Sequence, residues 1–304
     1  MHDGAMPRRA YVPRQLRLLP FRGSEAIAQG LLTRSALRGK AWRRVFPDTY
    51  LPSHVELDYR MSCWAAAVYI GPSGAIAGVS AAFLHGIEVP RDDRVHVITR
   101  RDLHRSVPDK LHAARAVLAP GDVVSLGGVR VTSAVRTCFD LARQLSLEEA
   151  VVAIDEFCFR RVVSLGDLIA YADARRRWPG SGGVLAVLGL VEPKSESPME
   201  TRLRLILVDG GLPRPLAQHE VRLNGTFIAR VDLAYPEWKI AIEYDGDHHR
   251  DREAFARDLR RQNRLIAAGW TILRFTATDI FRNQDGVVAQ VRAVIPEPVP
   301  WSGR

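Results

Sequence analysis

The sequence predicts a mixed α/β fold (α+β overall), in which helices and short strands alternate along most of the chain. Three observations support this. Several segments repeat apolar residues at helical spacing, and others alternate apolar and polar residues as half-buried strands do. A third is the Asn224-Gly225 pair between two strand-like runs, which is a strong hairpin signal. With 304 residues the chain is long enough for two or more domains.

The first 50 residues carry most of the net charge: ten Lys and Arg against three acids, or +7 of the formal +9. We expect residues 1–20 to form a basic flexible arm. Residues 21–90 are predicted to form a winged helix-turn-helix domain, because two short helix patterns, at 25–29 and 33–38, precede a strand-turn-strand pattern at 42–51. The side chains expected to contact DNA are Arg34, Arg38, Lys40, Arg43 and Arg44. The alternative is a solvated basic face on a small helical domain.

Residues 91–190 are predicted to form an α+β middle region. Strand-like alternation at 95–98 and 129–132 is followed by three helical segments, at 133–144, 146–158 and 164–174. The four histidines between 85 and 112 are far apart in spacing, so each is expected to be a packing or surface residue.

Composition excludes some classes of protein and of site. The three cysteines are scattered without a CxxC pair, which argues against a zinc ribbon and for a reducing compartment. No apolar run has the length of a membrane span, and no signal-type apolar core follows the basic N-terminus. We therefore expect a cytoplasmic, nucleoid-associated protein without a membrane partner. A strong positive charge also favours a polyanionic partner such as DNA.

Residues 191–304 are predicted to form the C-terminal core, in the order α-β-β-β-α-β with one further helix. The first helix begins after Ser197-Pro198, which resembles a capping box with proline at the first helical position. The elements expected are a helix at 199–208, strands at 219–223, 226–233 and 239–244, a helix at 251–268, a strand at 270–275 and a helix at 278–293.

Acids lie on two of these strands, and a double histidine follows. Asp232 is on the second strand, and Glu243 and Asp245 are at the end of the third. Two carboxylates about 4 Å apart repel each other by roughly 4 kcal/mol at an effective dielectric constant near 20, a cost that a bound cation removes. We predict a Mg²⁺ or Mn²⁺ site on Asp232, Glu243 and the carbonyl of Tyr244. Alternatively, the acids are salt-bridged to arginines such as Arg230 and Arg274.

Further residues are candidates for the same site. His249, or else His248, is predicted to act as general base or to protonate the leaving oxygen. Glu200 either completes the site or only holds the start of its helix. Asp258 and Arg260 are expected to orient the site from behind it, or else to form a surface ion pair.

The C-terminal part resembles the restriction-endonuclease-like, or PD-(D/E)xK, core. It is most similar to the Vsr-like branch, which includes very-short-patch repair endonucleases and uncharacterised bacterial proteins. The residues that carry the resemblance are Glu200, Arg230-Val231-Asp232, Ile242-Glu243-Tyr244-Asp245-Gly246, His248-His249, Asp258, Arg260, Asn263, Gly269-Trp270 and Arg274-Phe275. It implies a metal-dependent DNA endonuclease with catalytic Asp232, Glu243, His249, Glu200 and Asp245. Many nucleases of this class carry Lys where this chain has Asp245, so an altered site that binds DNA without cutting it is the alternative.

Residues 20–140 more loosely resemble the winged-helix half of AbiEi-type antitoxins. The similarity is carried by Leu32-Thr33-Arg34 and by the segment from Ser80 to Gly86. It implies a transcriptional repressor that binds DNA and a nucleotidyltransferase-type toxin without catalysis. The sequence leaves the oligomeric state open.

Overall fold

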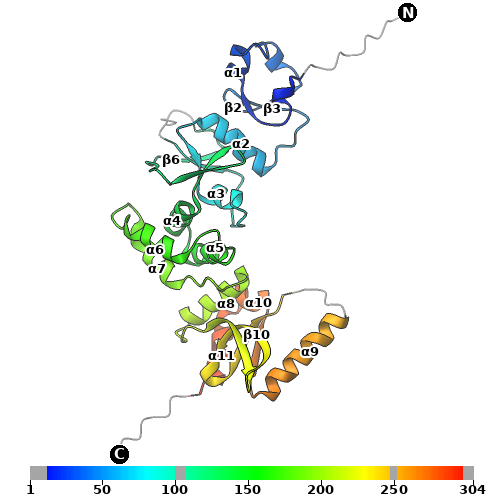
Figure 1. Ribbon diagram of the computed structural model, residues 1–304, viewed down its shortest axis with the longest axis vertical. Coiled ribbons are helices and arrows are strands. Elements are labelled where there is room, and N and C mark those ends of the chain that lie inside the picture. Colours follow the sequence, from blue (N-terminus) through cyan, green and yellow to red (C-terminus); the bar gives the residue numbers. More distant parts are fainter. Residues whose placement is uncertain (1–11, 100–106, 247–251, 297–304) are drawn as a thin grey trace, which may run out of the picture. The chain divides into compact units, whose positions relative to one another are not determined.

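The computed structural model describes residues 12–99, 107–246 and 252–296, and its elements are drawn in Figure 1. The chain divides into two compact units, Met1–Leu141 and Ala142–Arg304. Helices and three separate sheets make up the described residues, which confirms the α+β fold class. None of the helices in these ranges is both long enough and apolar enough to cross a membrane.

Unit 1 begins with a small three-stranded antiparallel sheet of order β1-β3-β2. Its core is made by Leu16, Ala26, Leu32, Leu37 and Trp42. The elements are η1 (Arg14–Leu16), β1 (Phe21–Arg22), α1 (Gly23–Ala28), η2 (Ala36–Arg38), β2 (Trp42–Phe46) and β3 (Thr49–Pro52).

The helix predicted at 33–38 is only the three-residue 3₁₀ turn η2. The Thr33 hydroxyl accepts the Ala36 N–H at 3.1 Å, which starts the turn, and Gly39 then adopts extended backbone and ends it. Strand β2 follows within a few residues, so no room is left for a helix of several turns. A winged helix for residues 21–90 therefore stays a prediction. The segment predicted as the recognition helix, 33–38, is too short to be a helix of several turns.

The remainder of unit 1 is a five-stranded mixed sheet of order β6-β5-β4-β8-β7, with α2 and α3 packed against it. Its buried charges are matched: Arg136, 1% exposed, donates to Asp140 at 2.7 Å and to Asp122 at 3.0 Å. The elements are α2 (Tyr59–Ile70), β4 (Ala75–Ile76), α3 (Gly78–Leu84), β5 (Val95–Ile98), β6 (Leu111–Ala114), β7 (Val123–Leu126), β8 (Val129–Thr132) and α4 (Ala134–Gln144).

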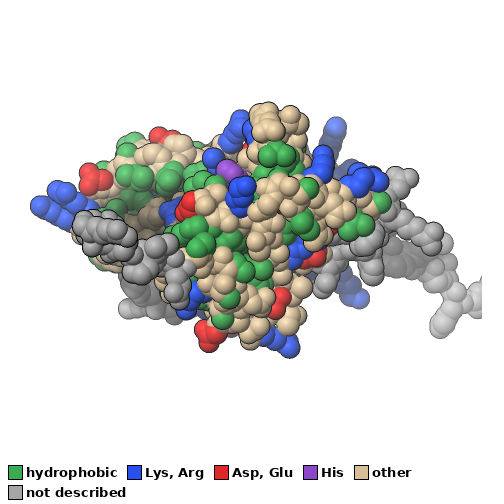
Figure 2. Space-filling model, turned by 90° about the horizontal axis from the view of Figure 1, so that it is seen from below, with side chains coloured by type: hydrophobic (Ala, Val, Ile, Leu, Met, Phe, Trp, Pro, Cys, Tyr) green, Lys and Arg blue, Asp and Glu red, His purple; other side chains and the backbone are tan. Residues whose placement is uncertain are grey.

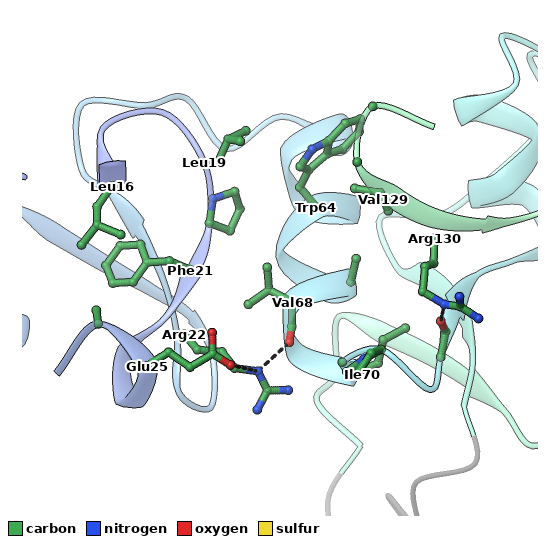
Figure 3. A pocket seen from close by; sticks show the side chains of 18 of the residues that line it. Leu16, Leu19, Phe21, Arg22, Glu25, Trp64, Val68, Ile70, Val129 and Arg130 are labelled. Atoms are coloured by element: carbon green, nitrogen blue, oxygen red, sulfur yellow. Dashed lines mark hydrogen bonds and ion pairs between the residues drawn. The ribbon is translucent and has the colours of Figure 1, made fainter. Parts of the chain in front are cut away.

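Unit 1 also contains a mostly apolar cavity of about 520 Å³ (Figure 3). Two of its charged lining residues, Arg22 and Glu25, lie 3.7 Å apart, and Arg22 also donates to the Val68 carbonyl at 3.1 Å. The cavity lining contains a single acid, so this cavity has none of the clustered carboxylates that the predicted site requires.

Unit 2 begins with the helices α5 (Leu147–Phe159), α6 (Leu165–Asp173) and α7 (Val184–Leu190). A buried ion pair ties α5 to α8 (Pro198–Asp209). Arg204, fully buried, donates to Asp155 at 2.8 Å, and the Thr201 hydroxyl donates to the same oxygen at 2.8 Å. Because both partners are buried and further hydrogen-bonded, this pair fixes how α8 sits on the preceding helices.

The C-terminal core is a four-stranded sheet of order β12-β11-β10-β9. Asn224 and Gly225 both have positive φ, 51° and 80°, as a type I′ turn between β9 and β10 requires. The predicted α-β-β-β-α-β order is present, but the last predicted helix is two helices separated at Asn283. The elements after α8 are β9 (Leu216–Leu223), β10 (Thr226–Tyr235), η4 (Pro236–Trp238), β11 (Ile240–Tyr244), α9 (Arg252–Ala267), β12 (Thr271–Phe275), α10 (Ala277–Arg282) and α11 (Gln284–Val294).

Two apolar clusters lie against this sheet. Residues of α8, α10 and α11 pack in one cluster and the buried residues of α9 in the other, with α9 and α11 on opposite sides of β10 in Figure 1. Leu259 and Ile266 of α9 are exposed, at 47% and 55%. The side of α9 that faces the sheet carries the buried Leu265, and the buried Ala268 follows directly after the helix.

Candidate active site

The two strand acids come together because β10 and β11 are antiparallel neighbours. Leu233 pairs with Ile242, so the register continued by one residue places Asp232 opposite Glu243. The Tyr244 backbone N–H donates to Asp232 Oδ2 at 3.0 Å, which holds this carboxyl at the end of β11. The predicted meeting of Asp232, Glu243 and Tyr244 is thus present in the geometry of the sheet.

Asp232 is the carboxyl with the least compensated charge. Burial above all, together with the charges of Glu200 and Glu243, raises its pKa to about 7, against the lowering effects of the Tyr244 N–H and of Arg261. It forms no ion pair with any described residue, since none of the ion pairs within 4 Å includes it. A carboxyl in this environment favours either a proton or a bound cation.

Glu200 holds the start of its helix, and its charge also acts on Asp232. It is 8% exposed, and its N–H donates to the Ser197 hydroxyl at 3.2 Å as in a helix cap. Its carboxylate accepts from the Ser197 hydroxyl at 2.9 Å and the Gln218 side-chain amide at 2.7 Å. These donors are neutral and do not offset the charge that Glu200 exerts on Asp232. Gln218 has a positive φ of 51°, an uncommon conformation for a residue other than glycine.

Glu243 is salt-bridged to arginines, as the alternative prediction had it. Arg261 of α9 donates to its two oxygens at 2.6 and 2.8 Å, and Arg274 Nε of β12 lies 3.3 Å away. Asp258 holds the same two arginines from the other side, with contacts of 2.8 to 3.1 Å. Arg230, the other arginine named in that alternative, pairs with Glu196 at 2.9 Å instead.

The cluster carries a surplus of negative charge. It contains five carboxylates (Glu200, Asp232, Glu243, Asp245 and Asp258) against the two arginines Arg261 and Arg274, a formal charge of −3. Carboxylates with a nearby backbone carbonyl are the donor types that Mg²⁺ and Mn²⁺ prefer, so the residue types fit a divalent cation.

The described ranges nevertheless hold no group of three or more His, Cys, Asp or Glu arranged as a metal site. The reason at Glu243 is that Arg261 occupies both of its oxygens. His248 and His249 lie outside the described residues. A cation could therefore use Glu243 only in exchange for an arginine.

The arginine that reaches the acids is Arg261, which our sequence analysis missed. Arg260, the residue named there, is exposed and makes no contact with the acids. A signal for Arg261 was present, because it is one turn before Leu265, the residue of α9 that is completely buried, and therefore shares its face.

The basic residues predicted to contact DNA are all exposed, and none of their side chains has a hydrogen bond or ion pair with a described residue: Arg34, Arg38, Lys40, Arg43 and Arg44. Basic side chains also occur elsewhere, and Figure 2 shows Lys and Arg at several separate places on one face, with apolar side chains between them. The positive surface is therefore not limited to the first 50 residues.

Comparison with known proteins supports the resemblance of the C-terminal core to nucleases. Residues 217–295 match the family model REase_MTES_1575, a restriction-endonuclease-like family. Two relatives are the uncharacterized proteins Rv2248 and MT2308 of Mycobacterium tuberculosis, from strains H37Rv and CDC 1551. Each is 26% identical over 252 residues, which cover 82% of this chain and 90% of the relative. The matched segment contains Asp232, Glu243, Arg261 and Arg274.

Proposed function

We propose that the C-terminal unit hydrolyses phosphodiester bonds in DNA with the help of a divalent cation. The observation that carries this proposal is Asp232, a partly buried carboxyl with no cationic partner among the described residues, beside the charges of Glu200 and Glu243 in a core that matches a nuclease-like family. A purely structural acid at a strand end would more commonly be paired or exposed.

The residues that would hold Mg²⁺ or Mn²⁺ are Asp232, Glu243 and the Tyr244 carbonyl. When bound, the cation would lower the pKa of a coordinated water and stabilise negative charge on the phosphate. The Tyr244 N–H orients Asp232, and Gln218 orients Glu200. His249 is proposed as the group that takes or delivers the proton, and Asp245 and His248 are proposed as further residues of the site.

The basic residues of unit 1 would bind DNA and so bring the C-terminal unit to its substrate. Arg34, Arg38, Lys40, Arg43 and Arg44 have no partner within the described part of the chain, so their charge is free to neutralise phosphates. Retention at the nucleoid in the cytoplasm would follow from such binding.

The test is cleavage of supercoiled plasmid, mismatched duplex and single-stranded DNA with Mg²⁺ or Mn²⁺. We expect nicking by the wild-type chain, loss of at least 100-fold in Asp232→Asn, and unchanged DNA affinity in that variant. Asp285→Asn, an exposed acid elsewhere in unit 2, is the matched control and should cleave normally. The proposal fails if no substrate is cleaved with either metal, or if Asp232→Asn cleaves like the control.

A second candidate is an AbiEi-type repressor that binds DNA and a nucleotidyltransferase-type toxin without catalysis. Two observations favour it: the unpaired basic residues of unit 1, and Asp245 where many nucleases carry lysine. It predicts sequence-specific binding to the DNA upstream of its own gene, lost in Arg34→Gln/Arg38→Gln, with no metal requirement. Absence of a neighbouring nucleotidyltransferase gene, together with metal-dependent cleavage, would exclude it.

A further inference from the structure

Helix α9 carries a groove that is dominated by arginine. It has a volume of about 700 Å³, and its lining residues are Arg257, Asp258, Arg260, Arg261, Asn263 and Arg264. Four arginines against one aspartate give the lining a formal charge of +3. Arg260 and Arg264 are exposed, and their side chains have no hydrogen bond or ion pair with the described residues, so their charge is available to a ligand.

We infer that this groove binds the sugar-phosphate backbone of the DNA that the acid cluster would cleave; the inference rests on the proposed function. Guanidinium groups bind phosphate oxygens through paired N–H donors, and arginine is the side chain best suited to this geometry. From Arg257 to Arg264 the helix rises about 10 Å. Measured along the axis of a duplex, one DNA strand presents about three phosphates over that length. This is comparable to the spacing of the arginines along α9.

Arg261 connects the groove to the acid cluster. It lines the groove and also donates to Glu243 at 2.6 and 2.8 Å. If a DNA backbone lay along α9, the side chain of Arg261 would be the group between it and the carboxylates. Asp258 contacts Arg261 at 3.1 Å as well, so this guanidinium stays anchored when its contact with Glu243 is exchanged for one with a phosphate.

The charge of the groove favours an anionic ligand such as a DNA strand. The acid cluster behind the groove has a surplus of negative charge that would repel an approaching phosphate. The arginines of α9 offset that repulsion along the path by which a strand would reach it. Without these arginines, the phosphates of a strand would be repelled by the full negative charge of the acid cluster.

The experiment measures binding of a 20-base-pair duplex by fluorescence anisotropy over a range of salt concentrations, without metal. All proteins carry Arg34→Gln, Arg38→Gln, Arg43→Gln and Arg44→Gln, so that unit 1 contributes little. To this background we add Arg260→Gln/Arg264→Gln. The matched control is Arg177→Gln/Arg282→Gln, which removes the same charge from two exposed arginines of unit 2 whose side chains form no hydrogen bond or ion pair with a described residue.

We expect the α9 pair to lower affinity at least tenfold and to reduce the slope of log K against log salt concentration by about 1.8, since each phosphate contact contributes about 0.9. The control should change the slope by much less. Equal effects of the two pairs would overturn the inference, as would an acidic peptide of the same charge that competes as well as DNA does. This experiment measures binding and not cleavage. If only the nuclease proposal is wrong, the α9 pair still changes the salt slope more than the control does. If the groove does not bind DNA, that difference between the two pairs is lost.

Discussion

Replacing Asp232 by asparagine should stabilise the C-terminal core, and by more at pH 8 than at pH 5. The side chain keeps its size, and its oxygen can still accept the Tyr244 N–H that now donates to Asp232 at 3.0 Å. What changes is the charge. An asparagine is neutral at every pH, as the protonated aspartic acid is.

The sign follows from the raised pKa. In the folded chain the pKa of Asp232 is raised from 3.8 to about 7, so the folded state holds a proton that the unfolded state releases. The free energy of unfolding therefore falls as pH rises from about 4 to about 7 and stays low above that. At about 1.4 kcal/mol for each pH unit, the full effect is about 4 kcal/mol. Because the carboxyl is only partly buried, we expect about 2 kcal/mol.

Hydrogen exchange of peptides covering residues 240–244, corrected for the intrinsic pH dependence of exchange, measures the local stability of β11. The gain in Asp232→Asn should be about 1–3 kcal/mol larger at pH 8 than at pH 5. Asp285→Asn should show no such difference. A gain that is equal at both pH values, or a loss at pH 8, would refute the argument that Asp232 is an uncompensated charge.

Three further substitutions test the contacts described above. Arg261→Gln should lower the stability of unit 2 by about 2–4 kcal/mol, because the buried carboxylate of Glu243 loses both of its hydrogen bonds from Arg261 and keeps only the ion pair with Arg274, whereas Arg260→Gln should change it by less than about 0.5 kcal/mol in urea unfolding. Asp155→Asn should cost about 3–5 kcal/mol by removing the charge that compensates a buried arginine of α8, and an unchanged urea midpoint would contradict this. Gly23→Ala should destabilise the first sheet by about 1–3 kcal/mol, because a Cβ would lie 2.5 Å from the Tyr50 ring; faster proteolysis within residues 12–52 is the readout.

The parts of the core that follow from local sequence were predictable. Asn224-Gly225 fixes a turn that only a few residue pairs adopt, and the strands on either side then run antiparallel. Once β10 and β11 are neighbours, the spacing of Asp232 and Glu243 from the intervening turn decides that they meet. These features depend on a few residues close together in the chain.

The parts that depend on packing between distant segments were not predictable. Helix α9 has apolar residues on more than one side, so its sequence does not say which side is buried. The sheet selects the side with Leu265, and this choice turns Arg261 inward and leaves Arg260 exposed. The same holds for Glu200, whose cap is readable from Ser197 but whose neighbour Gln218 is on a separate strand.

The position of Arg261 links the acid cluster to the groove on α9. Its guanidinium binds both oxygens of Glu243, and those N–H groups cannot bind a phosphate at the same time. Any ligand that takes Glu243 therefore frees Arg261 for the groove, and any phosphate that takes Arg261 frees Glu243 for a cation. By linkage, each ligand then increases the affinity for the other by the same factor. Such coupling would keep Glu243 paired with Arg261 until DNA is present.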